Sequence, residues 1–360
     1  MIIKVYTLKD ILYKAGRKDY SKLVRQVIIN KRGNKQTIYR RVDKPIVEKT
    51  ASTQEILDNI KYYGPVSLKK VFTDRSEDKV YYKSLFWSIE SLNIPTTEIS
   101  LSDIKEVKAI NGNSINSVFL LKRKDGKKFI YKPAHMEHYD ERTGLSKGYF
   151  RFCQFAHEGL YYKIASLLGV DYLFPKTSVA HIGDSYGALI EYIDDKNYKL
   201  ANQAPTGTWA LIQEHPKDYA IMTLLDFITG NLDRHNGNYF VNVETGEIRG
   251  IDHGLSFEAK SVLQPLRQIL SVISNPKREY YDNMLFETLS SKIDVSDFRR
   301  KLKENKDEII KLVETIIPAT VASSRDPNLD KEIIDTFRRK VDLVINAPED
   351  KIPISAANSK

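Results

Sequence analysis

One short segment limits what this chain can fold into more than any other feature of its sequence. Residues 230–238 read GNLDRHNGN, and a hairpin pattern then leads to IDHG at residues 251–254. Transfer of a phosphoryl group needs a carboxylate that orients the attacking hydroxyl and oxygen ligands for magnesium on the triphosphate. Asp233, Asn238 and Asp252 offer these groups in a suitable order. The segment therefore predicts a phosphoryl-transfer site.

The spacing of these residues separates that interpretation from a simpler one. Asp, Asn and Gly are the usual turn residues, so Asp233 and Asn238 would, in the simpler case, merely cap a helix and form a turn. The step of five residues between them is, however, that of the Asp and Asn in the catalytic loop of protein kinases. The intervening hairpin would bring Asp252 back beside Asn238. The combination favours a kinase-like site.

The two segments resemble the phosphoinositide-kinase branch of the protein-kinase-like superfamily, and they are similar to HipA-type, actin-fragmin and secretory-pathway atypical kinases. These families place Arg-His directly after the aspartate, as this chain does. The resemblance covers residues 104–345 and implies an enzyme that binds ATP and Mg²⁺. It implies that Asp233 orients the acceptor hydroxyl and that Asn238 and Asp252 hold the metal.

The N-terminal half offers partners for this site. Lys132 ends the β-prone run FIYK and precedes a proline, a form that resembles the strand lysine of HipA-type and phosphoinositide kinases. An ammonium at that place can neutralise the α- and β-phosphates of ATP. Glu158, near the start of a predicted helix, would pair with Lys132, and Glu141 is the competing partner. In the simpler explanation, Glu158 occurs there only because the helix dipole favours an acidic residue in the first turn.

Two further segments would line the nucleotide. The polar turn before residue 118 contains one glycine only and so departs from the Gly-X-Gly-X-X-Gly pattern, but its backbone amides can cradle phosphates. The turn residues expected at the phosphates are Gly112, Asn113, Ser114 and Ser117. Residues 188–193 precede the helical half, where an interlobe hinge would lie. Backbone groups of Glu191 and Ile193 are therefore expected to bind adenine, with an ordinary buried strand as the alternative.

The order of the predicted elements indicates an α+β, two-lobed protein-kinase-like fold with a β-rich N-lobe and a helical C-lobe. Alternating and apolar runs predict strands at 118–121, 129–132, 176–182 and 186–192, with a helix over 155–168 between the second and third. Helical periodicity follows at 218–228, 265–274, 278–289, 295–315 and 329–345, with one hairpin at 239–243 and 247–251.

We expect four regions along the chain. They are an N-terminal accessory region (1–100), the N-lobe (101–195), the C-lobe (196–347) and a flexible tail (348–360). The accessory region contains a predicted basic hairpin, with strands at 23–29 and 36–42, and a predicted helix over 53–63. It would contribute no group to phosphate chemistry, and would serve either to dock a partner or to cover a sheet edge.

Composition narrows the class of protein. With 360 residues, of which 41% are hydrophobic, the chain can bury a sizeable core. The formal charge of +9 favours contact with phosphates, but the basic residues are spread along the chain, so nucleic acid is not the expected partner. The longest apolar run, 219–230, is interrupted by Asp226 and is too short to span a bilayer. We expect a soluble, cytoplasmic protein.

Cysteine and histidine patterns argue against other metal chemistry. The single cysteine, Cys153, rules out an intrachain disulfide and a cysteine-based zinc site. His135, His138 and His157 lack the spacing of a zinc helix. At the proposed site, histidines 235 and 253 are expected to orient neighbouring groups by hydrogen bonds rather than to act as bases.

These expectations point to an ATP- and Mg²⁺-dependent phosphotransferase that acts on protein Ser or Thr, because HipA-type and actin-fragmin kinases act on protein. Two alternatives use the same fold, namely a phosphoinositide kinase acting on a lipid headgroup and an enzyme that transfers AMP. A non-catalytic kinase-like scaffold is the alternative from another class. The presence together of Lys132, Asp233, Asn238 and Asp252 argues against the scaffold.

Overall fold

The computed structural model describes most of the chain. The described residues are 2–3, 23–29, 35–41, 62–65, 67–76, 78–110, 117–137, 149–205, 207–212, 214–231, 233–257, 293–323 and 327–346. The chain divides into two compact units, 1–59 and 60–360. In the first unit, β2 (Leu23–Ile29) pairs antiparallel with β3 (Lys35–Arg41), and β1 (Ile2–Ile3) pairs with β2. The predicted strand pair is present, with its second strand starting one residue earlier than expected.

A seven-stranded sheet opens the second unit, in the order β4-β6-β7-β8-β11-β10-β5. Its strands are β4 (Tyr62–Pro65), β5 (Thr96–Ile99), β6 (Ile104–Ile110), β7 (Val118–Arg123), β8 (Lys128–Pro133), β10 (Thr177–Ile182) and β11 (Ser185–Glu191). All neighbours pair antiparallel except β5 and β10, which run parallel. The strands predicted at 118–121, 129–132, 176–182 and 186–192 are present as β7, β8, β10 and β11.

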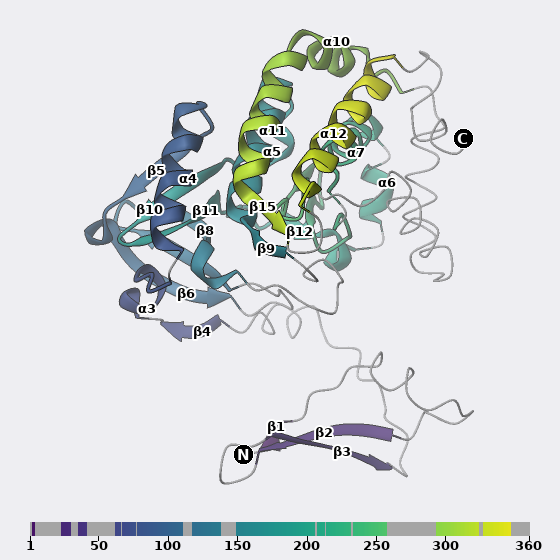
Figure 1. The fold of residues 1–360 in the computed structure, drawn as a ribbon. Helices are drawn as coiled ribbons and strands as arrows, with labels where there is room; N and C mark the ends of the chain where they lie inside the picture. Colours follow the sequence, from purple (N-terminus) through teal and green to yellow (C-terminus); the bar gives the residue numbers. More distant parts are fainter. Residues whose placement is uncertain are drawn as a thin grey trace. The chain divides into compact units, whose positions relative to one another are not determined.

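The two faces of this sheet are covered by different helices, because successive residues of a strand point to opposite faces. On β8, Tyr131 is fully buried against Phe72 of α3 (Leu68–Phe72), with ring centroids 5.6 Å apart. The next residue, Lys132, meets α5 (Gln154–Leu167) instead. In Figure 1, α4 (Lys79–Ser91) lies near β5 and β10, in agreement with its contacts.

Helix α5 packs closely on β10. Its Gly159 makes this possible, because a Cβ there would lie 2.7 Å from Cγ2 of Val179, closer than two methyl carbons can approach. The same helix buries Leu160, Tyr161 and Ile164 completely. One hydrophobic core joins these residues to the helices that follow.

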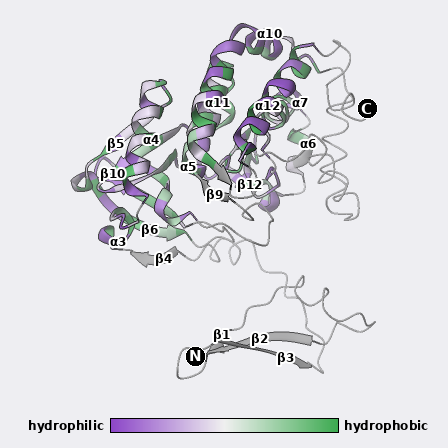
Figure 2. Ribbon diagram, viewed as in Figure 1, coloured by the Kyte–Doolittle hydropathy of each residue, from purple (hydrophilic) through white to green (hydrophobic). Residues whose placement is uncertain are grey.

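The C-terminal half is mainly helical. The helices among its described residues are α6 (Thr208–Ile212), α7 (Pro216–Thr229), α10 (Ser296–Glu304), α11 (Lys306–Thr320) and α12 (Leu329–Asn346). A small sheet of β12 (Tyr198–Leu200), β13 (Tyr239–Asn242) and β14 (Ile248–Gly250) accompanies them, and β9 (Tyr149–Phe152) pairs with β15 (Val321–Ser323). Figure 2 shows hydrophilic and hydrophobic residues alternating along α11 and α12, as expected for helices with one buried side.

A β-rich first half and a helical second half confirm the predicted two-lobed α+β fold. None of the helices in the described ranges combines the length and the apolar character needed to cross a membrane. The hairpin β13–β14 and helices α5, α7 and α12 lie where the sequence predicts them.

Three expectations differ from the structure or fall outside it. Tyr62 and Tyr63, predicted to end a helix, lie in β4, because they pair with β6. The single helix predicted over 295–315 is two helices that meet at Asn305, which belongs to neither. The helices predicted at 265–274 and 278–289, and the rest of the one predicted over 53–63, lie outside the described residues.

The division of the chain also differs from the predicted boundary at residue 100. Residues 62–99 form β4, α3, α4 and β5, and the two strands extend the sheet of the second unit at its two ends. Pairing of β4 with β6 and of β5 with β10 is long-range, so it leaves no local signal in the sequence.

Candidate active site

The motif loop begins where α7 ends. Gly230 has a φ of 69° and is the left-handed residue that closes the helix, with its N–H donating to Phe227 O at 3.3 Å. The N–H of Asn231 donates to Asp226 O at 2.9 Å. This termination turns the chain away from the helix axis and into the segment that carries Asp233.

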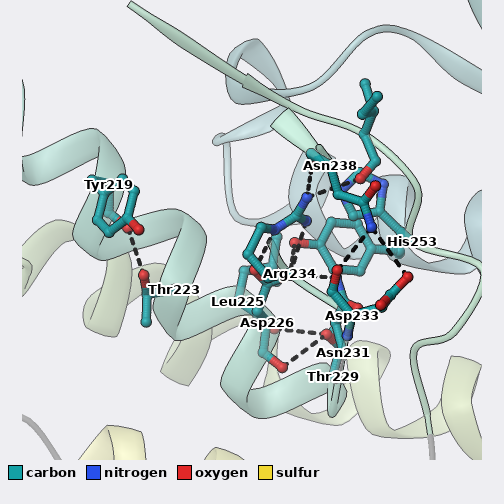
Figure 3. Close-up of polar contacts among 12 residues, drawn as sticks. Tyr219, Thr223, Leu225, Asp226, Thr229, Asn231, Asp233, Arg234, Asn238 and His253 are labelled. Atoms are coloured by element: carbon teal, nitrogen blue, oxygen red, sulfur yellow. Dashed lines mark hydrogen bonds and ion pairs between the residues drawn. The ribbon is translucent and has the colours of Figure 1, made fainter. Parts of the chain in front are cut away.

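Arg234 connects the loop to its surroundings (Figure 3). Its side chain is 13% exposed, and its Nε and Nη2 donate to the two carboxylate oxygens of Asp226 at 2.8 and 3.1 Å. Its Nη1 donates to the carbonyl oxygens of Asn238 and Ile251, the latter at 2.8 Å. One guanidinium therefore binds α7, the end of the motif loop and the residue before Asp252.

Asp226 is a buried carboxylate that accepts several hydrogen bonds. Besides Arg234, the Tyr161 hydroxyl and Asn231 Nδ2 donate to its Oδ1 at 3.0 and 2.8 Å. A buried charge is tolerated when it is paired and hydrogen-bonded in this way. Neither Asp226 nor Arg234 was predicted as a site residue. The available signal was the one acid within the apolar run 219–230, eight residues before an arginine.

Asp233 and Asn238 face one another across the loop (Figure 3). Asn238 Nδ2 donates to the backbone oxygen of Asp233 at 2.8 Å and to its carboxylate at 3.1 Å. Asn238 is buried, whereas the Asp233 side chain is 42% exposed. Burial, together with the charge of Asp252, raises the pKa of Asp233 above its ordinary value, although His235 acts in the opposite direction.

Lys132 bridges two carboxylates. Its Nζ lies 2.6 Å from Glu158 Oε1 and 2.6 Å from Asp252 Oδ1, so the predicted pair with Glu158 is present and Asp252 joins it. Burial alone would lower the pKa of Lys132, but the two carboxylates raise it above its ordinary value. Burial works against ionisation of Glu158 as well, yet Lys132 and His253 hold its pKa below the usual range.

The segment after β14 holds Asp252 in an uncommon backbone conformation. Asp252 has a φ of 62°, which costs a non-glycine residue on the order of 1 kcal/mol or more and is found mainly where the surroundings enforce it. The contacts of the next residue, His253, hold Asp252 in this conformation. The N–H of His253 donates to Glu158 Oε2 at 3.1 Å, and its ring stacks on Tyr161 with centroids 3.9 Å apart.

The two histidines of the site make the kind of contact that was expected. His253 has a ring Nδ1 at 3.5 Å from Glu158 Oε2, and burial lowers its pKa, which favours the neutral ring. His235 Nδ1 accepts the Gly237 N–H at 2.9 Å, and its Nε2 lies 3.9 Å from Asp233 Oδ1.

The residues proposed for magnesium fit that ion. The amide nitrogen of Asn238 is occupied as a donor, which leaves its Oδ1 as an acceptor, and Asp252 Oδ2 is not the oxygen that Lys132 contacts. Magnesium commonly takes one or two protein oxygens and fills the rest of its shell with phosphate and water. Within the described ranges no three His, Cys, Asp or Glu side chains form a group that could hold a metal.

The other predicted residues are less closely connected. Gly112, Asn113, Ser114 and Glu141 lie outside the described residues. Ser117 is partly buried just before β7. At the expected hinge, the N–H of Glu191 already donates to Lys176 O at 2.9 Å, so it is not available to a base, whereas Ile193 forms no backbone hydrogen bond with another described residue.

Glu137 was also missed by the sequence analysis. It lies five residues after Lys132, and its two carboxylate oxygens accept the N–H groups of Gln154 and Phe155 at 3.0 and 2.8 Å. These are the first amides of α5, which an acidic cap satisfies. Burial raises the pKa of Glu137 to about 8, against the influence of the two amides.

Residues 192–324 match the family model described as phosphatidylinositol 3- and 4-kinase. The matched span contains Asp233, Asn238 and Asp252 and confirms the resemblance to the atypical kinase-like superfamily; it supports assignment as a phosphotransferase. A solved structure described as a Helicobacter pylori proinflammatory kinase, CtkA, is 15% identical with a TM-score of 0.38, over 73% of this chain and 98% of that one. No match was found among the curated proteins.

Proposed function

We propose that this chain is an ATP- and Mg²⁺-dependent phosphotransferase of the atypical kinase type. The observation that carries the proposal is the pair of 2.6 Å contacts made by Lys132, one to Glu158 and one to Asp252. These contacts join positions that lie 26 and 120 residues from Lys132 in the chain. A turn or cap alone does not require such a convergence.

Each residue has a separate role in the proposed reaction. Lys132 binds the α- and β-phosphates, and Glu158 holds its ammonium in place. Asn238 and Asp252 hold Mg²⁺, which when bound neutralises charge on the phosphates. Asp233 orients the acceptor hydroxyl and takes up its proton, a role supported by the raised pKa of its carboxyl.

The acceptor we propose is a Ser or Thr hydroxyl of a protein, on the resemblance of the motif to HipA-type and actin-fragmin kinases. The second candidate is an inositol lipid headgroup, which the family match over residues 192–324 favours. Both acceptors present a hydroxyl to Asp233, so the same residues serve either reaction.

The nucleotide assignment is tested with Asp252→Ala. Loss of this carboxylate removes a ligand for magnesium, so the thermal stabilisation of the protein by MgATP should vanish while its fold is kept. Asp103→Ala, at an exposed aspartate in the short helix Leu101–Asp103, is the matched control. An unchanged thermal shift in Asp252→Ala would show that the metal assignment is wrong.

The reaction is tested by incubating the protein with MgATP labelled at either the α- or the γ-phosphate. We expect the γ-label to reach protein, read by intact mass as addition of a phosphoryl group. Vesicles of phosphatidylcholine with phosphatidylinositol form the second arm, and label in the lipid would select the second acceptor. Transfer of the α-label would mean AMP transfer and would contradict the proposal.

A further inference from the structure

Helix α5, which carries Glu158, is held at its start by the end of α11. The two helices lie side by side (Figure 1). The carbonyl oxygen of Thr320, the last residue of α11, accepts the N–H of Cys153 at 3.2 Å. The next residue, Val321, pairs with Phe152 between the strands β15 and β9. The end of a distant helix therefore fixes the residues that lead into α5.

A buried hydrogen bond between side chains joins the same two helices. His157 Nε2 lies 2.9 Å from Thr320 Oγ1, and both residues are completely buried. Burial lowers the pKa of His157 to about 4, against the opposing influence of the Gly254 and Ser256 backbone, so the ring is neutral at neutral pH. A neutral imidazole can form this bond in either direction, because its Nε2 donates in one tautomer and accepts in the other. The two helices are therefore joined without burial of a charge.

His157 also contacts the segment that follows Asp252. Its ring centroid lies 5.5 Å from that of Phe257, in an edge-on arrangement. The N–H of Phe257 in turn donates to Thr229 O, at the end of α7, at 2.6 Å. Phe257 has a φ of 63°, close to the 62° of Asp252, so this segment begins and ends in the left-handed region. Residues other than glycine keep that conformation only where their surroundings enforce it.

Glu158, the neighbour of His157 on α5, holds the other end of that segment. Its Oε2 accepts the His253 N–H at 3.1 Å, while its Oε1 contacts Lys132. Two consecutive residues of α5 thus contact residues 253–257 near both ends, and one of the two is bonded to α11. A shift of α5 at His157 would therefore displace Glu158 from Lys132 and from His253 together.

We propose that His157 and Thr320 are positioning residues for the nucleotide site. The bond between them sets the place of α5, and α5 in turn holds Glu158 against Lys132 and the segment that follows Asp252. The inference rests on the proposed function, because Lys132 and Asp252 are the groups that the bond serves. The simpler alternative is that the pair only stabilises the core, and in that case its loss would leave affinity for the nucleotide unchanged.

Thr320→Val removes the hydroxyl but keeps the branched shape and the backbone bond to Cys153. We expect MgATP, measured by calorimetric titration of the full chain, to bind at least about tenfold more weakly, because the buried His157 loses its partner. Thr320→Ser keeps the hydroxyl and should bind MgATP as the wild type does. Equal affinity of the wild type and Thr320→Val would overturn the proposal.

The same bond can be tested from its other side. A glutamine amide reaches the place of Nε2 of a histidine ring, whereas an asparagine amide reaches only that of Nδ1. His157→Asn should therefore weaken MgATP binding as Thr320→Val does, and His157→Gln should restore most of the affinity. Equal affinities of the two variants for MgATP would contradict a role for the bond to Thr320.

Two controls separate positioning from stability. Thr315→Val removes an exposed hydroxyl that, like that of Thr320, donates to the carbonyl four residues earlier in α11. Thr336→Val removes a buried hydroxyl from α12. Both variants should bind MgATP as the wild type does. A loss in either control as large as that in Thr320→Val would mean that reduced stability alone weakens binding, and the proposal would be wrong.

A double-mutant cycle tests whether the bond acts through Glu158. Glu158→Gln removes the charge that holds Lys132 and should itself weaken MgATP binding. Thr320→Val added to Glu158→Gln should cost clearly less affinity than it costs alone, because residues that act through one another are not additive. Full additivity of the two losses would contradict positioning through Glu158.

Amide hydrogen exchange in the wild type supplies a test that needs no variant to fold. MgATP should slow exchange of the Val321 N–H, which bonds to Ile317 O, because coupling between two sites acts in both directions. The Asn305 N–H, between α10 and α11, is the control and should not respond. Unchanged exchange at Val321 with MgATP bound would overturn the proposal.

One measurement without nucleotide separates this inference from the proposed function. Thr320→Val should speed exchange of the His253 N–H and leave that of Asn305 unchanged, because Glu158 then holds the His253 N–H less firmly. An unchanged rate at His253 would overturn the positioning role alone. Failure of the wild type to bind MgATP would instead contradict the proposed function, and with it the purpose assigned to this bond.

Discussion

Asp233 differs from the other carboxylates of the site in its surroundings. Glu158 is 1% exposed and bonded to Lys132, and Asp252 shares the same ammonium. Asp233 has no such contact with a lysine or arginine among the described residues, and its carboxylate is held by the amide of Asn238. A carboxylate that is positioned but not neutralised is the one suited to take a proton from a hydroxyl.

Asp233→Asn keeps the size of the side chain and removes the proton acceptor. We expect affinity for MgATP to survive and single-turnover transfer to fall by ~10²-fold or more. Because burial raises the pKa of Asp233, the wild-type rate should decline on the acid side at a pH above the ordinary carboxyl range, and the variant should lack this limb. Transfer at the wild-type rate would mean that another group is the base.

Arg234→Lys tests the structural role of Arg234. This arginine is part of the motif, but the spacing of the motif residues does not indicate what it does. Lysine keeps the charge but cannot reach Asp226 and the carbonyls of Asn238 and Ile251 together. We expect a loss of about 3–5 kcal/mol in the free energy of unfolding, measured by chemical denaturation. Arg300→Lys, at an exposed arginine of α10, is the control and should cost under about 1 kcal/mol. Equal losses of stability in the two variants would contradict a structural role for the buried guanidinium of Arg234.

At the scale of elements, α5 is held at its start by a residue from outside the helix. Its N-cap position, Cys153, forms no side-chain cap, and Glu137 accepts the first two amides instead. Glu158 lies four residues after Gln154, one turn into the helix. The cap therefore fixes the turn that presents Glu158 to Lys132, and α5 is joined both to β8, through Lys132, and to the segment that follows β8, through Glu137.

Glu137→Gln should change how stability depends on pH. The pKa of Glu137 is about 8 in the folded protein against an ordinary 4.5, with burial as the main cause and Lys132 and Glu158 as the charges that face it. Between these two values the unfolded chain releases the proton and the folded chain keeps it, so this group makes the wild type less stable as pH rises. Above about pH 8 both states are ionised and the loss is complete.

Chemical denaturation at several pH values between about 5 and about 8.5 measures this dependence of stability on pH. The stability of Glu137→Gln relative to the wild type should increase across the interval, because glutamine does not titrate. Glu90→Gln, at an exposed glutamate of α4, should run parallel to the wild type. Parallel curves for all three proteins would show that Glu137 keeps an ordinary pKa.

The elements that could be predicted from the sequence are those with local signals. The β7–β8 hairpin has a Lys-Asp-Gly-Lys turn between apolar runs, and α7 ends at a glycine. In contrast, β4 follows apolar residues at helical spacing and becomes a strand only through pairing with β6. Apolar periodicity likewise continues through Asn305, so it gave no indication of the break between α10 and α11.

The residues of the candidate site likewise fall into those that the sequence predicts and those that it does not. Residues that must follow one another at fixed steps, such as Asp233 and Asn238, are visible in the sequence. Asp226, Arg234 and Glu137 act through burial and through partners set by tertiary packing, and a sequence pattern contains neither. At the predicted hinge, the N–H of Glu191 is already bonded to Lys176 O, a long-range detail that no sequence pattern indicates.

At the scale of the whole molecule, the boundary between the two units leads to a prediction about truncation. A protein that begins at Ile60 keeps the whole seven-stranded sheet and both clusters of its core. A protein that begins at Ser100 loses β4, α3, α4 and β5, and with them seven buried hydrophobic residues: Val71, Phe72, Leu85, Phe86, Ile89, Ile94 and Ile99. Burial of one such side chain contributes about 1.5–3 kcal/mol, so the seven together match or exceed the usual 5–15 kcal/mol of net stability.

We therefore expect the protein that begins at Ile60 to unfold cooperatively and to be stabilised by MgATP, and the protein that begins at Ser100 to aggregate. Thermal melting and size-exclusion chromatography measure both properties, with the full chain as reference. A soluble, cooperatively folded protein from Ser100 would contradict the assignment of residues 62–99 to the sheet and core. Loss of MgATP binding in a folded protein from Ile60 would contradict the view that residues 1–59 contribute nothing to phosphate chemistry. If that protein binds MgATP but transfers phosphate to its acceptor poorly, the first unit serves to dock the acceptor.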